Sequence, residues 1–509
     1  MSTGASPISS ATDTVRKPPL FRNRTWLTWT GIGLGVGIVA FLIRLVPVLR
    51  GGGLKGFYNY DPAVYYAAAV GMAHGLMPYR DFLLLHAPGV PVALLPFALI
   101  GLQTTDSTGM ALARLAIMVM GSVSAVLVTR VLKPVGTGAA VIGGLAYAVY
   151  WPAVYVERAA WLEGFGSFLT ILAMLLVLGV PRFRERHPRW AMVLAGASLS
   201  LACAVKVWAI VPLLTVLVWV LLRRKWLDAA ALTGGAAAAG VAMLLPFVTA
   251  LSPMWQMVVS AQLGRQRGAA DTWLMRVEGL SGLNVVWSGH IHVAAAAAAV
   301  AIVAISLLAV RTSEGRLALL LVATGGVLLM TGPTWFRHYP ALIAAPLAVA
   351  LGAGAAQVIG WLRPRWLKAV ALLLATGTLA TVGVMLSTER VGTRFAGKQL
   401  AQIVEGLPGC LTTDDPNALI VSDLLDANLK QGCQFVIDLS GYRYVVGDRQ
   451  TFTKNAEWQQ FVRDYLGSGS AVILLRGTTK ARMDAETKAL YSRWPVVDEV
   501  SGHAVRVPE

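Results

Sequence analysis

The sequence predicts a polytopic α-helical membrane protein, with about 11 transmembrane helices and a small extracytoplasmic α/β domain at the C-terminal end. Hydrophobic residues make up 56% of the 509 positions and charged residues only 14%, and the mean hydropathy is +0.63. Such values exclude an ordinary soluble protein. The formal net charge is +17, but most Lys and Arg residues lie in short clusters between apolar runs. This distribution follows the positive-inside rule and does not require a nucleic-acid partner.

The N-terminal end predicts a cytoplasmic tail followed by a retained helix. Residues 1–25 are rich in Ser, Thr, Pro and Arg, which is typical of a disordered segment. The apolar run Trp26–Leu49 is long enough to span a bilayer and lacks a clear cleavage motif, so we expect a helix and not a signal peptide. Basic residues precede this run, which places the N-terminus inside.

The following loop, residues 50–108, is predicted to lie outside and to carry interfacial helices. Its second half, Leu83–Leu102, is apolar but contains Pro88, Pro91 and Pro96, and proline disrupts helical hydrogen bonding. If this segment crossed the membrane, Arg130 and Lys133 would also end outside. We therefore expect it to lie in the outer interface or dip into it.

Ten further spans alternate across the membrane, and the charges between them agree with this alternation. They complete a transmembrane domain over residues 26–387 and place the C-terminus outside. The predicted spans are Gly109–Val131, Gly136–Trp151, Phe165–Val180, Trp190–Val205, Val207–Leu222, Ala229–Ala250, Ile291–Val310, Leu317–Met330, Ala341–Trp361 and Ala369–Leu386.

The composition becomes polar and mixed from residue 388 to residue 509. Short apolar patches alternate with turn or helical segments, which is typical of a small α/β domain. Cys410 and Cys433 both lie in this region, and outside the cell they could form a disulfide. The alternative is two unrelated buried thiols. We favour the disulfide because it agrees with the topology that the charges predict.

Polar residues gather in the outer loops, whereas the inner loops carry little beyond Arg and Lys. A transporter would be expected to place charges near mid-membrane and often to contain an internal repeat, and we find no repeat of that kind. The distribution predicts a site at the outer membrane boundary. We expect three acidic residues to be catalytic and eight others to bind substrate or lipid phosphate. The catalytic candidates are Asp61, Asp81 and Glu163, and the binding candidates are Arg80, His86, Lys206, Arg265, Arg267, Arg337, His338 and Tyr339.

Such residues suit glycosyl transfer from a polyprenyl phosphate sugar. The leaving group is a lipid phosphate, which cations such as Lys206 and Arg265 would stabilise. The acceptor hydroxyl needs a general base, for which a carboxylate is suitable. Asp61 is the first choice, Asp81 the second and Glu163 the third. A nucleotide-sugar donor would instead require an inner site and a soluble phosphate-binding domain.

The segment YDPAVYYAAAVGMAHGLMPYRDFLLLHAPGV resembles the first outer loop of the GT-C superfamily of membrane glycosyltransferases. WLEGFG, CAVKVWAIVP and WFRHYPALIAAP resemble its later outer motifs, and the resemblance extends over residues 26–386. It implies that Asp61 is the catalytic base, that inversion occurs at the sugar carbon, and that the first loop contains two interfacial helices. Pro62 stands where the family usually has an acidic residue, which argues against metal binding by this loop. No cofactor is expected, although metal dependence stays open.

Each of these residues also has a structural interpretation. Asp61 before Pro62 suits a helix N-cap, Asp81 could simply pair with Arg80, and Lys206 could extend to the interface. Glu157 and Arg158 could form an exposed pair. The Asp-Asp-Pro sequence at 414–416 favours a turn over a metal site.

The function that the sequence favours is transfer of arabinofuranose or mannose from a polyprenyl phosphate donor to a cell-envelope glycan, lipid or protein. The expected location is the plasma membrane. Two alternatives stay open, namely a transporter or flippase of lipid-linked sugars and a non-catalytic relative of the same superfamily.

Overall fold

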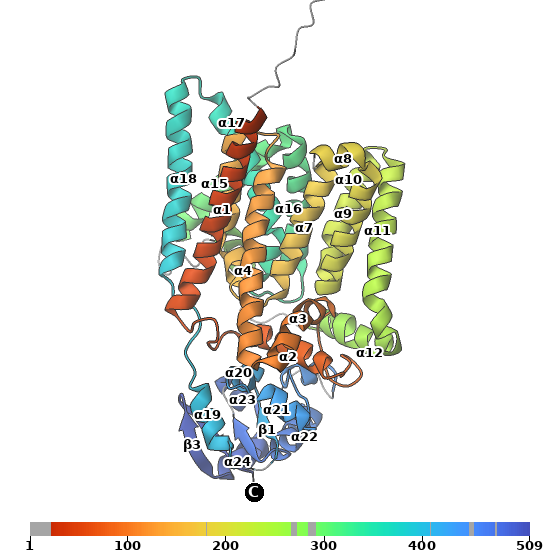
Figure 1. Cartoon of the computed structure of the whole chain (residues 1–509), viewed down its shortest axis with the longest axis vertical. Coiled ribbons are helices and arrows are strands. Elements are labelled where there is room, and N and C mark those ends of the chain that lie inside the picture. Colours follow the sequence, from red (N-terminus) through yellow and green to blue (C-terminus); the bar gives the residue numbers. More distant parts are fainter. Residues whose placement is uncertain are drawn as a thin grey trace, which may run out of the picture.

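The protein is a helical bundle with a smaller mixed α/β region at one end (Figure 1). The structure is a computed structural model, and it describes residues 22–179, 181–265, 272–282, 292–407, 409–446, 452–473 and 476–508. Within these residues, seven helices are long and apolar enough to cross a membrane, or eight if one bent pair counts as a span. The protein is therefore a multi-pass membrane protein.

The long apolar helices run side by side through the bundle (Figure 1). They are α1 (Arg22–Arg50), α4 (Asp106–Val131), α9 (Pro188–Val205), α11 (Trp226–Leu244), α16 (Ser313–Thr331), α17 (Ala344–Trp361) and α18 (Arg365–Thr388). The candidate spans containing α11 and α17 extend over Trp226–Leu263 and Tyr339–Trp361. Helix α18 exposes Leu373 and Leu374 by 69% and 67%, as expected of a helix that faces lipid.

All eleven predicted runs coincide with helical segments. The bent pair is α5 (Thr137–Val149) and α6 (Trp151–Glu157), which meet at 58°, so the predicted run Gly136–Trp151 breaks at its end. Three more runs correspond to shorter apolar helices, which are α7 (Leu162–Leu178), the pair η1 (Val207–Ala209) and α10 (Ile210–Leu222), and the pair α15 (His292–Leu307) and η4 (Leu308–Arg311). The total of about 11 spans stays a prediction, because the apolar helices among the described residues of these runs, Leu162–Leu178, Val207–Leu222 and Ala299–Arg311, have only 10–17 residues each.

Small residues let neighbouring helices approach closely. Helices α9 and α11 meet at Gly196 and Gly235. A Cβ atom at Gly196 would lie 1.9 Å from the Leu232 carbonyl oxygen, and one at Gly235 would lie 2.0 Å from that of Val193. Backbone contact through small residues is a common way for helices to associate in a membrane. Apolar side chains gain little free energy there by moving from lipid into the protein.

Buried ion pairs join the helices near the α/β end. Arg44 of α1 pairs with Glu157 at the end of α6, and both side chains are fully buried. Tyr147 of α5 donates a 2.6 Å hydrogen bond to the other Glu157 oxygen. Arg158 pairs instead with Glu389, just after α18. The interpretation of Glu157 and Arg158 as an exposed pair is therefore wrong, because each is buried against a different partner.

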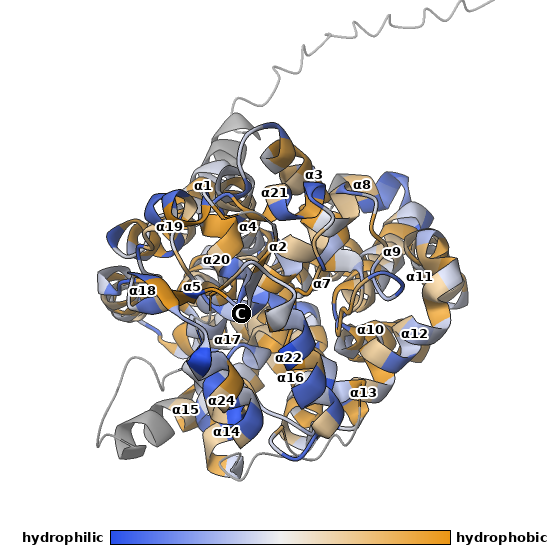
Figure 2. Cartoon of the chain, turned by 90° about the horizontal axis from the view of Figure 1, so that it is seen from below, coloured by the Kyte–Doolittle hydropathy of each residue, from blue (hydrophilic) through white to orange (hydrophobic). Residues whose placement is uncertain are grey.

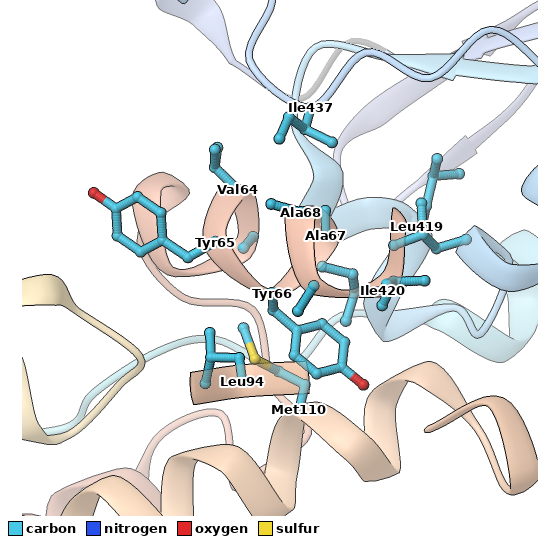
Figure 3. Packing of buried hydrophobic residues seen from close by; sticks show 14 of the residues in the cluster. Val64, Tyr65, Tyr66, Ala67, Ala68, Leu94, Met110, Leu419, Ile420 and Ile437 are labelled. Atoms are coloured by element: carbon cyan, nitrogen blue, oxygen red, sulfur yellow. The ribbon is translucent and has the colours of Figure 1, made fainter. Parts of the chain in front are cut away.

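Two helices of the first loop lie between the bundle and the α/β region (Figure 1). They are α2 (Tyr60–Ala73) and α3 (Gly89–Gln103), and α3 is too short to be counted among the spanning candidates. Figure 3 shows α2 packed between Leu94 and Met110 on one side and Leu419, Ile420 and Ile437 on the other. Helix α2 therefore shares one hydrophobic core with both parts of the protein.

The C-terminal region is built on a four-stranded sheet with strand order β1-β2-β4-β3. Strand β1 pairs in parallel with β2, whereas β4 is antiparallel to both β2 and β3. The strands are β1 (Leu411–Thr413), β2 (Ala471–Ile473), β3 (Val496–Val500) and β4 (His503–Arg506). The accompanying helices are α19 (Gly397–Val404), α20 (Pro416–Val421), α21 (Leu425–Lys430), α22 (Ala456–Gly467), α23 (Gly477–Arg482) and α24 (Ala485–Arg493).

Viewed from this end, α20, α22 and α24 lie in front of the membrane helices, and hydrophilic stretches of α22 and α24 are visible (Figure 2). Cys410 and Cys433 form a disulfide between the start of β1 and the loop after α21. The Asp-Asp-Pro sequence does not form a simple turn, because Asp415 caps α20 and accepts a 2.9 Å hydrogen bond from the Asn417 backbone.

The remaining elements are short or lie at the edges of the bundle. They are α8 (Pro181–Arg186), η2 (Leu245–Ala250), α12 (Leu251–Trp255), the π-helical η3 (Gln256–Ser260), α13 (Ala261–Leu263), α14 (Trp273–Ser281), η5 (Tyr339–Ile343) and η6 (Gly441–Tyr444). Helix α8 lies at the end of the bundle opposite the α/β region (Figure 1).

Candidate functional site

Asp61 lies in the first turn of α2, at the junction of the bundle and the α/β region. The helix begins at Tyr60, so Asp61 is not the N-cap residue, which is Asn59. The loop before it is held by Arg114 of α4, whose guanidinium donates to the Gly56 carbonyl at 3.0 Å and lies 3.9 Å from the Tyr58 ring centre. Arg114 therefore fixes the loop before the helix, and Pro62 is the third residue of α2. Together these features place the Asp61 carboxylate in one defined position.

Burial raises the pKa of Asp61 from its usual value to about 6, and the charges of Asp438 and Glu163 act in the same direction. The guanidinium groups of Arg476 and Arg265 partly oppose this shift. A carboxyl group with such a pKa is mostly ionised at neutral pH and still able to accept a proton. This is the property required of a general base.

Glu163, Lys206, His338 and Tyr339 form a second cluster beside Asp61. Glu163, in the first turn of α7, pairs with Lys206 and lies 3.6 Å from His338 Nε2. The Lys206 ammonium lies 3.9 Å from the Tyr339 ring centre and 4.7 Å from that of Trp208. Lys206 follows the last residue of α9 and Tyr339 begins η5, so three separated parts of the chain converge here.

A cavity of about 100 Å³ opens beside this cluster, and its wall includes Lys206 and Tyr339. His86 and Gln262 also line it. Burial lowers the pKa of His86 well below its usual value, and the nearby cations Arg265 and Lys206 lower it further. His86 is therefore neutral, and it can take part in a hydrogen bond without adding a charge.

Two of the predicted cations flank the site and one lies outside the described residues. Arg265 stacks 4.8 Å from the Tyr444 ring centre, and its buried Nε atom has no hydrogen-bond partner in the part of the chain that the structure describes. Arg337 is exposed, and its charge acts on Tyr155 together with those of Asp61 and Glu163. Arg267 falls in the segment 266–271, which the structure does not describe.

Arg80 and Asp81 are not part of this cluster. Both residues are exposed, and they pair with each other at 2.7 Å. Asp81 also accepts a hydrogen bond from the Met77 backbone, and these contacts lower its pKa to about 2. Asp81 is thus a poor proton acceptor near neutral pH, in contrast to Asp61.

The C-terminal region supplies residues that the sequence did not single out. Asp438 accepts a 2.8 Å hydrogen bond from the Tyr60 hydroxyl, and Arg476 lies 3.8 Å from the Tyr60 ring centre. Nothing in the sequence links Tyr60 to Asp438, because 378 positions separate them. The α/β region therefore forms one wall around Asp61.

A second cavity of about 520 Å³ lies near the N-terminal end of α2. Its wall includes the aromatic side chains of Phe57, Tyr58, Trp151 and Tyr155. Asn59 also lines it and donates a 2.9 Å hydrogen bond to the Tyr155 hydroxyl. This cavity and the Lys206 cavity have no lining residue in common, so they are separate spaces.

The fold and the site define a multi-pass membrane protein with acidic and basic groups gathered at one end of its bundle. Among the described residues, no group of three or more His, Cys, Asp or Glu side chains could hold a metal. The arrangement can accept a proton at Asp61 and hold an anion near Lys206 and Arg265.

No protein-family profile matches the sequence, and no curated protein matches it. Among solved structures, the chain resembles ArnT from Cupriavidus metallidurans bound to undecaprenyl phosphate, with a TM-score of 0.60 and 13% identity over 94% of this chain and 98% of that one. It also resembles the Archaeoglobus fulgidus oligosaccharyltransferase, with a TM-score of 0.55 and 13% identity over 87% of this chain and 69% of that one. A structure of the latter, AglB, in complex with an inhibitory peptide and a dolichol-phosphate gives a TM-score of 0.54 at 12% identity. The chain therefore has the fold of the GT-C membrane glycosyltransferases.

Proposed function

We propose that the protein is a glycosyltransferase that moves a sugar from a polyprenyl phosphate to a cell-envelope acceptor on the outer face of the membrane. The observation that carries this proposal is the position of Asp61, a half-buried carboxyl group with a pKa of about 6 beside the Glu163–Lys206 pair. Two structures of the same fold were determined with undecaprenyl phosphate or dolichol-phosphate bound. Arabinofuranose and mannose are the proposed donor sugars, and the acceptor is a glycan, lipid or protein.

In this reaction, Asp61 accepts the proton of the acceptor hydroxyl. The hydroxyl oxygen forms a bond to the anomeric carbon, and the bond from that carbon to the phosphate oxygen breaks with its electron pair leaving on the phosphate. Attack from the face opposite the leaving group inverts the anomeric centre. A base with a pKa near 6 suits this step because it is ionised at neutral pH yet still basic.

The leaving lipid phosphate is placed beside the cavity that Lys206 and Tyr339 line. Lys206 and Arg265 then stabilise the negative charge that develops on the phosphate. Neutral His86 lines the same cavity and can donate one hydrogen bond to a phosphate oxygen. Glu163 holds Lys206 in place through their ion pair, and the 3.6 Å approach of His338 adds a second polar neighbour.

The proposal is tested in a deletion strain complemented with wild-type protein, with Asp61→Asn or with Asp81→Asn. Mass spectrometry of lipid-linked sugars and envelope glycans would follow the donor and the product. We expect the deletion strain and Asp61→Asn to accumulate one polyprenyl phosphate sugar and to lose one glycan linkage. Asp81→Asn is the matched control, because it makes the same change at an exposed carboxylate outside the cluster. Normal product with Asp61→Asn would refute the role of Asp61.

A transport assay separates the flippase alternative. Purified protein in vesicles that contain a polyprenyl phosphate sugar but no acceptor should not increase the rate at which that lipid crosses the bilayer. Accelerated crossing that Asp61→Asn does not change would favour the transporter over the transferase.

A further inference from the structure

Three arginines of the C-terminal region form a continuous row that ends beside Asp61. They are Arg443, Arg482 and Arg476, which we call the arginine row. Arg443 and Arg482 lie 4.0 Å and 4.1 Å from the ring centre of Phe452. Arg482 and Arg476 both donate to the Ser440 hydroxyl, at 3.2 Å and 3.3 Å. Arg476 then stacks on Tyr60, the residue before Asp61.

The positive charges of this row are close together and lack paired carboxylates. Two guanidinium groups that share one hydroxyl or one ring repel each other at short range. Burial lowers the pKa of Arg482, and repulsion from the nearby cations Arg476 and Arg443 lowers it further. Within the described part of the chain, no ion pair joins a carboxylate to Arg443, Arg476 or Arg482.

The row also contains unused hydrogen-bond capacity. Among the described residues, the buried Nε atom of Arg443 has no hydrogen-bond partner. Guanidinium groups bind phosphate and carboxylate oxygens with paired hydrogen bonds. A bound anion would satisfy these donors and offset the repulsion within the row.

We propose that the arginine row binds an anionic group, phosphate or carboxylate, carried by the acceptor. This proposal rests on the proposed function and adds the chemical class of the acceptor. All three arginines belong to the C-terminal region, whereas Lys206 follows a membrane helix. The charges that act on Asp61 come from both directions, with Arg476 and Asp438 from the C-terminal region and Glu163 from the Lys206 pair. The row therefore reaches Asp61 from the C-terminal region through Arg476 and Tyr60, and we assign it to the acceptor.

Binding to the purified full-length protein in lipid nanodiscs tests the proposal. The probes for the row are inorganic pyrophosphate and digalacturonate, measured by calorimetry, and the probe for the donor side is undecaprenyl phosphate, measured by native mass spectrometry. We expect wild-type protein to bind at least one of the two soluble anions, and which one it binds identifies phosphate or carboxylate. Arg443→Gln and Arg482→Gln should each weaken that binding about tenfold and leave undecaprenyl phosphate binding unchanged within about twofold. Lys206→Met should show the opposite pattern.

Lys480→Gln is the matched control, because Lys480 is an exposed cation of the same region that stacks on Tyr491, outside the row. Arg443→Lys should retain part of the affinity, and thermal melting of every variant would show whether it is folded. The proposal is overturned if wild-type protein binds neither soluble anion, or if Arg443→Gln weakens binding no more than Lys480→Gln does. It is also overturned if the row variants weaken undecaprenyl phosphate binding equally. Unchanged lipid-linked sugars and envelope glycans in the deletion strain would instead refute the proposed function and leave the anion site intact.

Discussion

At the scale of single residues, Asp61 differs from the other acidic candidates by its surroundings. Asp81 faces solvent and pairs with Arg80, while Glu163 is committed to Lys206. Asp61 forms no ion pair within the described residues, and its pKa rises because burial and two carboxylates disfavour its charge. A carboxylate without a fixed partner is free to accept a proton from a substrate.

The pH dependence of transfer should follow the ionisation of Asp61. Because the base acts in its deprotonated form, the rate should fall as the pH drops below about 6 and level off above it. Asp438→Asn removes a charge that raises this pKa, so the inflexion should move to lower pH. Arg476→Gln removes a charge that lowers the pKa, so the inflexion should move to higher pH. Measurement of kcat/KM from about pH 4.5 to pH 8 checks both directions.

Asp81→Asn serves as the control for these profiles and should leave the inflexion where the wild-type protein has it. An inflexion that Asp438→Asn leaves in place, or moves to higher pH, would contradict the assignment of the titrating group to Asp61.

Sequence reasoning selected candidate residues on the membrane side of the site but none from the α/β region. Five candidates could be selected from the sequence because an outer loop or a span end is an unusual place for such side chains, and these are Asp61, Glu163, Lys206, His338 and Tyr339. Asp438 and Arg476 gave no such signal, because Asp and Arg are ordinary residues in a polar α/β region. Their proximity to Tyr60 arises only from long-range packing.

At the scale of elements, the prolines of the first loop and the charges of the next one predicted that Leu83–Leu102 would not cross the membrane. In the structure the corresponding α3 has 15 residues and ends in the Thr104–Thr105 turn before α4. Helix α2 was not identified as a structural link. Its Gly71 lies so close to the C-terminal region that a Cβ atom there would be 2.5 Å from Phe435, and no local pattern reveals such a contact.

The contact between α9 and α11 leads to a prediction with an internal control. Gly235→Val should destabilise the protein by about 1–3 kcal/mol, because the new side chain would have to displace the Val193 backbone. Gly234→Val makes the same change one position earlier, where no atom lies within 4 Å of the new Cβ. Both variants share the helix propensity of valine, so the difference between their melting temperatures in detergent measures the packing term. Equal melting temperatures would contradict the close approach of these helices.

At the scale of the whole molecule, the basic residues of α8 and the candidate site lie at opposite ends of the bundle. Helix α8, with Arg184 and Arg186, lies at the end away from the α/β region (Figure 1). By the positive-inside rule, we predict that the α8 end faces the cytoplasm and that the α/β region faces outward. The polyprenyl phosphate sugar of the proposed reaction would then be consumed on the outer face, and the α/β region would cover the site from the aqueous side.

The disulfide allows this orientation to be tested. Disulfides persist in oxidising compartments and are rare in the cytosol, so Cys410 and Cys433 should resist a maleimide–polyethylene glycol reagent until they are reduced. The experiment uses spheroplasts that carry the Cys203→Ala variant, so that only Cys410 and Cys433 can react. A membrane-impermeant phosphine should reduce the disulfide and make both cysteines reactive. A gel shift that corresponds to two attached maleimide–polyethylene glycol molecules would show this. Labelling without reduction would contradict the disulfide. The opposite result would be that the two cysteines are labelled after a membrane-permeant phosphine but not after the impermeant one. That result would place the α/β region in the cytosol and exclude an outward-facing transfer site.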